Sequence, residues 1–276
     1  MQLVNSKGFG AAVVAMACLP TVLLWGLWRQ SASEQVSEME RPELPVDGSR
    51  HFGETWWKAH ERNQASGQRF QCDASKPPLV FLGDSILESL LGTELGRAVP
   101  RTQGVAEVLK IYERHWRPLV LAIAGDQTQH LLYRMPKELP GCLQSSSKST
   151  FLVLIGTNNL GAGFSVEQTV KGIMAVAEWL LENTQGRLIF LHLLPRNKPS
   201  RHGQLQSKVA AVNGAMDVEL ALRNASGRLE VNRCGSFFLL EPPGKTVKIW
   251  EELMPDRLHP NDQGHARLAE CLMESI

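Results

Sequence analysis

Short apolar runs alternate with longer segments of helical periodicity along most of the chain. Five runs have the length of a strand: residues 79–82, 119–124, 151–155, 188–193 and 229–231. Helical patterns follow them at residues 86–98, 128–135, 166–183, 203–223 and 261–275, and Ser165 with Gln168 resembles a capping box before the third. Nearly continuous apolar strands that alternate with helices are typical of a parallel sheet covered on both faces. The pattern therefore predicts an α/β domain with functional loops after the carboxyl ends of its strands.

The N-terminal part of the chain follows a different pattern. Residues 8–28 carry no charge and lie between Lys7 and Arg29. About 20 apolar residues are enough to cross a bilayer as a helix, which favours a membrane anchor. A cleaved signal peptide, with a shorter apolar region of about 7–15 residues, and a buried soluble helix are the alternatives. We expect an anchor or signal peptide at 1–28, a polar linker at 29–50, and one domain at 51–276 that begins with a short amphipathic helix.

Charge and cysteine content narrow the choice of partner and compartment. Lys and Arg total 29 against 28 Asp and Glu, without a long basic block, so nucleic acid is not expected as a partner. Cys18 lies in the apolar run, and four more cysteines could form two disulfides in an exported domain, although their spacing does not fix the pairing: Cys72, Cys142, Cys234 and Cys271. The glycosylation sequon Asn224-Ala225-Ser226 weakly favours a lumenal or extracellular domain. The flanking charges nearly balance and leave the membrane orientation open.

The loop after the first apolar run has the residues of a nucleophile site. Gly83 permits a sharp turn, and Ser85 follows it at the start of a predicted helix, whose N-terminus offers backbone donors to an anion. Asp84 and Ser85 are also preferred helix caps, so capping alone would explain this loop when it is taken by itself. We expect Asp84 to support the loop rather than to react.

Two further loops offer hydrogen-bond donors to a developing oxyanion. Gly125 follows the second apolar run, where a backbone N–H can approach substrate closely, and Asn158 follows the third run with a side-chain amide. Taken alone, a plain strand-to-helix turn would explain either loop. Before the last helix, Asp256 precedes His259 by three residues, and such a carboxylate can fix the tautomer of an imidazole that serves as general base. A surface loop with an Asp cap is the alternative for this last pair.

Taken together, these segments resemble blocks I, II, III and V of the SGNH (GDSL-type) hydrolases. The family is named for a Ser, a Gly, an Asn and a His, which match Ser85, Gly125, Asn158 and His259. Within it, the chain is most similar to the catalytic subunits of the intracellular, type I platelet-activating-factor acetylhydrolase. The supporting segments are residues 125–130, Tyr133-Arg134, residues 156–159, residues 193–196, Leu258-His259, and Trp57 with His60 and Arg62.

The resemblance implies a fold, a chemistry and a set of site residues. The fold is a flavodoxin-like, three-layer α/β/α sandwich with a five-stranded parallel sheet. The chemistry is hydrolysis of small acyl esters, often acetyl esters, without metal or other cofactor. Ser85, Asp256 and His259 would form the triad, with Ser85, Gly125 and Asn158 as the oxyanion hole. Three residues would lie near the acyl group: Ile86, Thr157 and Leu194.

The resemblance leaves the substrate and the partners open. Ile86 stands where the GDSL motif has Leu, and Ala122 and Ala124 stand where relatives often have Gly. The apolar run, the linker and the sequon are foreign to the cytosolic enzyme, which leaves a homodimer open. The expected enzyme is a serine esterase in the membrane or secretory pathway, acting on a lipid ester or an acetylated glycan. A membrane-anchored polysaccharide O-acetyl-esterase or acyltransferase, and a non-catalytic binding module on the same fold, are the alternatives.

Overall fold

The computed structural model describes residues 41–72, 75–197, 205–240 and 248–276. The expected anchor at 1–28, and the part of the expected linker before Arg41, lie outside the described residues. Residues Arg41–Ile276 form one compact unit. Within the described ranges, no helix combines the length and the apolar character that a membrane crossing requires.

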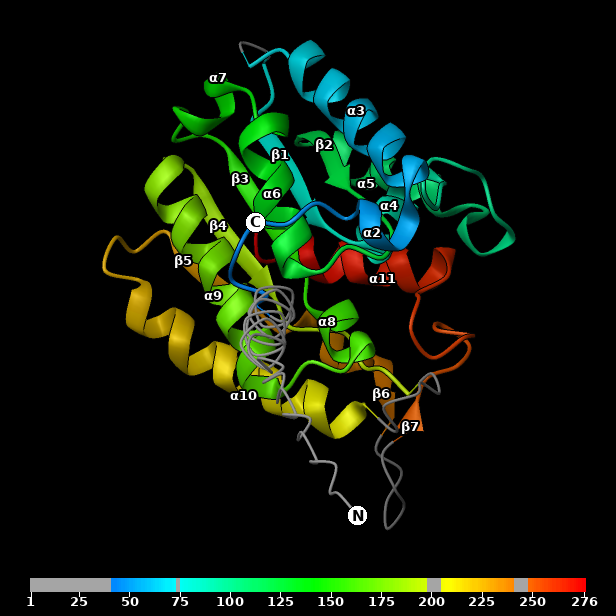
Figure 1. Cartoon of the computed structure of the whole chain (residues 1–276). Coiled ribbons are helices and arrows are strands. Elements are labelled where there is room, and N and C mark those ends of the chain that lie inside the picture. Colours follow the sequence, from blue (N-terminus) through cyan, green and yellow to red (C-terminus); the bar gives the residue numbers. More distant parts are fainter. Residues whose placement is uncertain (1–40, 73–74, 198–204, 241–247) are drawn as a thin grey trace, which may run out of the picture. The chain divides into compact units, whose positions relative to one another are not determined.

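A parallel sheet of five strands forms the centre of the domain, in the order β2-β1-β3-β4-β5 (Figure 1). Phe81 of β1 pairs with Val120 of β2 on one side and with Leu152 of β3 on the other. The five predicted apolar runs coincide with the five strands to within two residues at each end. Their bounds are β1 Pro78–Gly83, β2 Arg117–Ala122, β3 Thr150–Leu154, β4 Arg187–Leu191 and β5 Leu229–Asn232.

Helices cover both faces of this sheet. On one face, four helices contact one another in succession: α3 Glu54–Arg69, α6 Thr128–Glu138, α9 Val166–Asn183 and α10 Gln206–Arg223. On the other face, α11 (Asp262–Met273) packs against α5 (Leu109–Glu113) and the 3-10 helix η3 (Val105–Val108). Figure 1 shows the sheet between these two layers. The predicted three-layer α/β/α sandwich with a five-stranded parallel sheet is thereby confirmed.

Shorter elements complete the connections between the strands. The predicted capping box is present at the start of α9, where Ser165 and Gln168 exchange hydrogen bonds of 3.1 and 2.9 Å with each other's backbone N–H. The small elements are α2 Ser49–Phe52, α4 Ser85–Glu88, η1 Ser89–Leu91, η2 Pro100–Thr102, α7 Gly141–Gln144, α8 Thr157–Ala162, η4 Cys234–Phe238, β6 Leu239–Leu240 and β7 Lys248–Ile249. The β6 and β7 strands pair antiparallel beside the main sheet.

The predicted helix at 86–98 is wrong beyond its first turns. The chain is helical only through α4 and η1, and Gly92 then ends the run in the left-handed conformation, with φ of 72°. The carboxylate of Glu88 accepts the backbone N–H groups of Leu95 and Gly96 at 3.1 and 2.8 Å. A continued helix would have committed those N–H groups to its own carbonyls, so the buried carboxylate favours a loop instead.

Residues 41–50, which were expected to belong to the linker, pack on the domain. Thr128 Oγ1 donates to the carbonyl of Pro42 at 2.8 Å, and the N–H of Val46 donates to the carbonyl of Gln129 at 3.1 Å. Lys171 of α9 pairs with Glu43 at 2.7 Å. Hydrogen bonds, rather than an apolar stripe, hold this segment on the helices, which is why its hydrophobic pattern resembles a linker.

Two disulfides form in the described residues, Cys72–Cys142 and Cys234–Cys271. The first ties the chain before β1 to α7, and the second ties η4 to α11. This pairing depends on how β1, α7, η4 and α11 pack, which explains why the spacing of the cysteines along the chain could not reveal it.

Candidate active site

The loops predicted to hold functional residues meet at the carboxyl ends of β1, β2 and β3. The strand order reverses beside β1, and parallel sheets gather functional loops at such a switch point. Ser85 begins α4 directly after β1, and Asn158 is the second residue of α8 after β3. Gly125 lies in the loop between β2 and α6. The topology therefore brings together segments that are far apart in the sequence.

The turn before Ser85 is sterically tight. A Cβ atom on Gly83 would lie 2.3 Å from the carbonyl oxygen of Leu154, so only glycine fits beside β3. Asp84 caps the new helix, and its Oδ1 accepts the N–H of Ile86 at 3.0 Å. Ser85 is left 6% exposed at the rim of the sheet. The expected supporting role of Asp84 agrees with this geometry.

Ser85, His259 and Asp256 lie in one chain of hydrogen bonds. Ser85 Oγ and His259 Nε2 are 3.0 Å apart, and His259 Nδ1 and Asp256 Oδ2 are 2.7 Å apart. The contact between Ser85 and His259 joins residues 174 positions apart in the sequence. A carboxylate on one ring nitrogen leaves the other nitrogen as a proton acceptor, which is the arrangement that activates a serine hydroxyl.

The loop that holds His259 is stabilised by short-range contacts. Asp256 Oδ1 accepts the N–H groups of Leu258 and His259 at 3.1 and 2.7 Å. Arg257 between them has φ of 59°, in the left-handed region, which lets the chain fold back on the carboxylate. Arg257 also pairs with Glu251 at 2.8 Å. One carboxylate therefore both shapes the loop and orients the imidazole.

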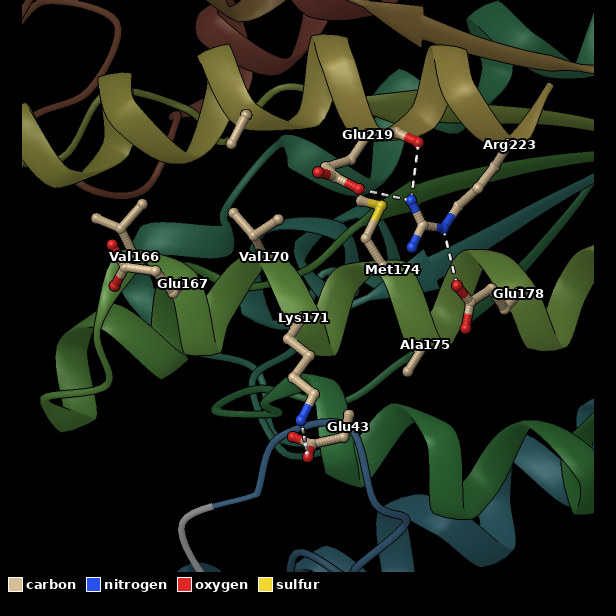
Figure 2. A pocket seen from close by; sticks show the side chains of 11 residues that line it. Glu43, Val166, Glu167, Val170, Lys171, Met174, Ala175, Glu178, Glu219 and Arg223 are labelled. Carbon is tan, nitrogen blue, oxygen red and sulfur yellow. Dashed lines mark hydrogen bonds and ion pairs between the residues drawn. The ribbon is translucent and has the colours of Figure 1, made fainter.

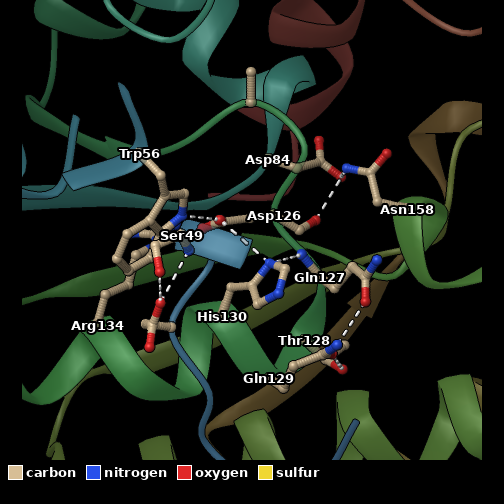
Figure 3. A network of polar contacts seen from close by, with 12 residues as sticks. Ser49, Trp56, Asp84, Asp126, Gln127, Thr128, Gln129, His130, Arg134 and Asn158 are labelled. Atoms are coloured by element: carbon tan, nitrogen blue, oxygen red, sulfur yellow. Dashed lines mark hydrogen bonds and ion pairs between the residues drawn. The ribbon is translucent and has the colours of Figure 1, made fainter. Parts of the chain in front are cut away.

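The predicted oxyanion donors lie beside the same rim. Gly125 has φ of 84°, and a Cβ there would lie 2.1 Å from Cζ of Phe52, whose ring packs on the glycine. Asn158 Nδ2 donates to the carbonyl of Asp126 at 3.0 Å and lies 3.4 Å from Asp84 Oδ2 (Figure 3). The amide of Asn158 is thus oriented by the loops that follow β1 and β2. The amphipathic pattern of residues 51–66 includes Phe52 but does not predict its contact with Gly125, because that contact depends on the packing of α2.

A buried ionic network lies beneath the Gly125 loop. Arg134 donates to Asp126 Oδ2 at 2.6 Å, to Glu138 at 2.5 Å and to the carbonyl oxygen of Gly83 at 2.8 Å. Trp56 Nε1 donates to Asp126 Oδ1 at 2.7 Å (Figure 3). The buried tryptophan of this network is Trp56, whereas the resemblance had drawn attention to Trp57. Arg134 thereby joins the turn before Ser85 to the loop that holds Gly125.

Glu88 is a second buried anchor of the site, and its side chain is fully buried. Its carboxylate accepts the N–H of Ala124 at 2.7 Å and pairs with Arg62 at 3.2 Å, in addition to the contacts with Leu95 and Gly96. One carboxylate therefore fixes both the residue before Gly125 and the loop after η1. The only sequence signal was an acidic residue within the apolar stretch Ile86 to Leu90.

Burial shifts the pKa of several groups around the site, and desolvation raises that of Asp126 to about 6. Desolvation raises the pKa of Asp84 to about 7, and the nearby Asp126 carboxylate adds to the effect, while the N–H of Ile86 and the cations Arg196 and Arg101 oppose it. Desolvation likewise lowers the pKa of His265 to about 3, so this histidine of α11 stays neutral. These pKa values shift because the groups lie in a protein interior of low dielectric constant. A hydrogen bond to an oxyanion is also strongest in such an environment.

The three residues expected near an acyl group are almost wholly buried. Ile86 and Leu194 are each 1% exposed, and Thr157 is 2% exposed. Leu194 packs on Gly235, and Thr157 accepts hydrogen bonds from Arg196 through its carbonyl and its hydroxyl at 2.6 and 3.2 Å. These contacts give each of the three a packing role, and contact with substrate stays a prediction.

Two cavities bear on where a ligand could bind. One, of about 570 Å³, adjoins the triad and is lined by His259, Asp256, Arg101, Gln103, Asn261 and Asp262 among others. The other, of about 660 Å³, is a groove between α9 and α10 (Figure 2). Its floor is apolar, with Val170 and Met174, and charged pairs such as Glu43 with Lys171 lie at its edge. None of the triad residues lines the groove.

The sequence is similar to known acetylhydrolase subunits. The alpha1 subunit of platelet-activating factor acetylhydrolase IB from Bos taurus is 29% identical over 167 residues, which cover 60% of this chain and 61% of the relative. The bovine alpha2 subunit is 27% identical over 226 residues, or 80% of this chain and 83% of the relative. The chain thus matches about three fifths of the length of the alpha1 relatives.

Solved structures share the fold. A GDSL-like lipase from Bacteroides thetaiotaomicron superposes with a TM-score of 0.58 at 13% identity, covering 78% of this chain and 96% of the other. An acetyl xylan esterase superposes with a TM-score of 0.51 at 17% identity, covering 72% and 99%. At such identities the likeness establishes the fold alone. The family model of the GDSL-like lipase/acylhydrolase family matches residues 81–267 of the chain. Lipases and acylhydrolases of this kind are carboxylic ester hydrolases, which is the enzyme class expected from the motifs. The chain belongs to the GDSL-like lipase/acylhydrolase family.

Proposed function

We propose that the protein is a serine esterase that hydrolyses esters of short acyl groups, acetyl esters above all. The observation that carries the proposal is the hydrogen-bonded chain from Ser85 Oγ to His259, at 3.0 Å, and from His259 to Asp256, at 2.7 Å. Membership of an acylhydrolase family supports the reaction class. The named activity of the similar mammalian subunits, an acetylhydrolase, supports a short acyl group.

The proposed reaction proceeds through an acyl-enzyme. Ser85 Oγ attacks the ester carbonyl while His259 Nε2 takes the hydroxyl proton, and Asp256 stabilises the imidazolium that results. The C–O bond to the alcohol then breaks, and His259 returns the proton to the departing alkoxide. Water repeats both steps on the acyl-Ser85 ester, which releases the carboxylic acid and the free serine.

Hydrogen-bond donors around Ser85 would stabilise the tetrahedral intermediate. The backbone N–H groups of Ser85 and Gly125 and the side-chain amide of Asn158 are the proposed donors. Asn158 is already oriented by Asp84 and by the carbonyl of Asp126. Because the amide nitrogen has only two N–H bonds, the longer contact with Asp84, at 3.4 Å, would give way to the oxyanion, while the bond to the carbonyl of Asp126, at 3.0 Å, keeps the amide in place.

The packing around Ser85 supports a short acyl group. Ile86, Thr157 and Leu194 are at most 2% exposed, and the ring of Phe52 lies on Gly125. Such dense packing favours a short acyl chain over a long one. The cavity beside His259 is instead lined by polar and charged side chains, including Arg101, Gln103 and Asp262. An alcohol with many hydroxyl groups would fit such a lining. This favours an acetylated glycan, beside a short-chain lipid ester, as a candidate substrate. The protein would then be an O-acetyl-esterase.

The test is ester hydrolysis by the purified full chain. We expect p-nitrophenyl acetate to be hydrolysed with a higher kcat/KM than the butyrate and octanoate esters, and Ser85→Ala to abolish all three activities. Ser145→Ala, at an exposed serine, is the matched control and should leave the rates unchanged. Acetate release from acetylated xylan compared with short-chain lipid esters then separates the two substrate classes. Equal activity in Ser85→Ala would overturn the proposal, as would wild-type protein that hydrolyses none of these esters.

A further inference from the structure

We propose that this domain carries an N-linked glycan on Asn224 and matures in an oxidising, glycosylating compartment. Asn224-Ala225-Ser226 is the one Asn-x-Ser/Thr triplet in the sequence. The triplet alone is weak evidence, because such sequences often arise by chance. Its conformation and the state of the cysteines are two further observations that point the same way.

The triplet forms a surface turn at the end of α10. Asn224 caps the helix, and its carbonyl accepts the N–H of Gly227 at 3.1 Å, which closes a four-residue turn. Gly227 has φ of 68°, a conformation that glycine adopts without strain. Ala225, Ser226 and Gly227 are exposed. The acceptor triplet is therefore presented on a reverse turn at the protein surface.

The side chain of Asn224 already has the orientation that a glycan requires. Its Oδ1 faces inward and accepts the N–H of Leu229 at 2.9 Å. Among the hydrogen bonds of the described residues, Nδ2 of Asn224 donates to none. Glycosylation replaces one N–H bond of Nδ2 by an N–C bond to the first sugar. A lipid-linked oligosaccharyl diphosphate supplies that sugar and leaves as the lipid diphosphate, and the amide proton goes to solvent. The inward hydrogen bond through Oδ1 is kept.

The disulfides supply independent evidence for the compartment. Cys72 bonds to Cys142 and Cys234 to Cys271, so all four cysteines of the described residues are paired. These bonds close stretches with sequence separations of 70 and 37. Disulfides of this kind form and persist in secreted and lumenal proteins and are rare where thiols are kept reduced. The same compartments are those in which Asn-linked glycans are added.

The position of the turn keeps a glycan away from the candidate active site. The turn leads into the first residue of β5, whereas the loops with Ser85, Gly125 and Asn158 follow the opposite, carboxyl ends of their strands. The neighbouring Arg223 is held by Glu178 at 2.8 Å and Glu219 at 2.7 Å, which fixes the last turn of α10 (Figure 2). A glycan on Asn224 is therefore expected to leave ester hydrolysis unchanged.

The experiment is expression of the full chain in cultured eukaryotic cells, followed by treatment with peptide-N-glycosidase F. We expect the wild-type chain to lose the mass of one glycan on treatment, with conversion of Asn224 to Asp in the tryptic peptide. Asn224→Gln and Ser226→Ala should both lack this glycan, and Ser226→Thr should keep it. Asn183→Gln is the matched control, because Asn183 is also exposed but is followed by Thr184 and Gln185 rather than by an acceptor triplet.

Two readouts decide the outcome. Non-reducing peptide mapping should find the Cys72–Cys142 and Cys234–Cys271 linkages in the glycosylated chain. An unmodified Asn224 in folded protein would overturn the proposal, and so would free thiols at these four cysteines. Ser226→Ala retains the asparagine and its hydrogen bond to Leu229, so this variant separates loss of the acceptor from damage to the fold. The proposal does not depend on the substrate, and either result leaves the proposed esterase to be judged by its own assay.

Discussion

The two halves of the candidate triad are held in place by different means. Ser85 stands on a turn anchored by buried, long-range contacts, in which Arg134 and Glu88 join β1, the Gly125 loop and α3. His259 stands on a loop shaped mainly by hydrogen bonds to Asp256 within three residues, together with the Arg257–Glu251 pair and one long-range bond from the N–H of Asn197 to the carbonyl of Arg257 at 3.0 Å. The Asp256 side chain is 34% exposed, whereas Glu88, Arg134 and Asp126 are fully buried.

This difference predicts which substitutions affect stability and which affect only chemistry. On the Ser85 side, removing an anchor leaves a charge buried without its partner, which costs free energy of unfolding. On the His259 side, the solvent-screened contacts are mostly local, and a substitution there mainly changes the tautomer and the orientation of the imidazole. Five substitutions test this division, from the largest expected effect to the smallest.

Asp256→Asn is expected to lower kcat by about 10⁴-fold, because an amide facing His259 Nδ1 favours the wrong tautomer. The asparagine Oδ1 still accepts the N–H groups of Leu258 and His259, so the melting temperature should change little. Steady-state kinetics and thermal denaturation measure the two effects. A large loss of stability with modest loss of turnover would show that the loop, rather than the imidazole, depends on this carboxylate.

Arg134→Met should cost about 3–5 kcal/mol of unfolding free energy, because Asp126 and Glu138 would remain buried without their cation. Denaturant unfolding measures this loss. The control is Arg233→Met, which removes an exposed pair with Asp217 and is expected to cost about 0–1 kcal/mol. If both variants unfolded at the same denaturant concentration, the buried network would not be what stabilises the turn before Ser85 and the Gly125 loop.

Asn158→Ala should reduce kcat by about 10²–10³-fold while KM changes little, since the amide is proposed to bind the oxyanion only as charge develops. Asn183→Ala serves as the matched surface control. Near-full turnover in Asn158→Ala, with the protein folded, would remove this side chain from the proposed oxyanion hole.

Asp84→Asn tests the effect of burial on a titrating group. The pKa of Asp84 is raised to about 7, so the folded state binds its proton more tightly than the unfolded state, where the pKa is 3.8. The wild-type chain should therefore lose stability relative to Asp84→Asn as pH rises between these values. The difference in unfolding free energy between the two proteins should change by about 2 kcal/mol between pH 5 and pH 7. The full slope is about 1.4 kcal/mol per pH unit, and the change is smaller because the carboxyl group is only partly titrated near pH 7. A pH-independent difference between the two proteins would show that Asp84 keeps an ordinary pKa.

Glu88→Gln is expected to lower kcat about tenfold, which corresponds to an activation barrier about 1.4 kcal/mol higher. The amide must turn a donor toward one of the backbone N–H groups, which loosens either Ala124 or the loop at Leu95 and Gly96. Faster amide hydrogen exchange at Ala124, with KM unchanged, would identify a positioning role. Glu94→Gln, at a partly exposed pair with Arg101, should alter neither quantity. Unchanged exchange and unchanged kcat in Glu88→Gln would exclude this role.

Local patterns in the sequence predicted the sheet better than the connections. Near-continuous apolar runs located all five strands, and the capping box located the start of α9, because both signals lie within a few residues. The helix expected at 86–98 is wrong beyond its first turns because the buried carboxylate of Glu88 accepts the backbone N–H groups of Leu95 and Gly96, contacts that periodicity does not reveal. The domain boundary differed because residues 41–48 are held by hydrogen bonds rather than by apolar side chains.

The candidate site shows the same contrast between signals that lie within a few residues and contacts that depend on packing. Ser85, His259 and Asp256 could be proposed from the sequence because the loops together resemble the motifs of one hydrolase family, although each loop alone is also explained by a cap or a turn. Glu88, Phe52 and the pairing of Trp56 with Asp126 could not, since each depends on how α2, α3 and α4 pack around the Gly125 loop. The disulfide partners were open for the same reason.

Identification of the residue that a fluorophosphonate probe modifies tests the central claim most directly. The probe reacts with a serine only where an adjacent base and oxyanion donors activate it. We predict one phosphonyl adduct, on the tryptic peptide that contains Ser85, absent in Ser85→Ala and formed far more slowly in His259→Ala. An adduct on another serine would contradict the account, as would wild-type protein that remains unlabelled while folded, or labelling that persists in Ser85→Ala.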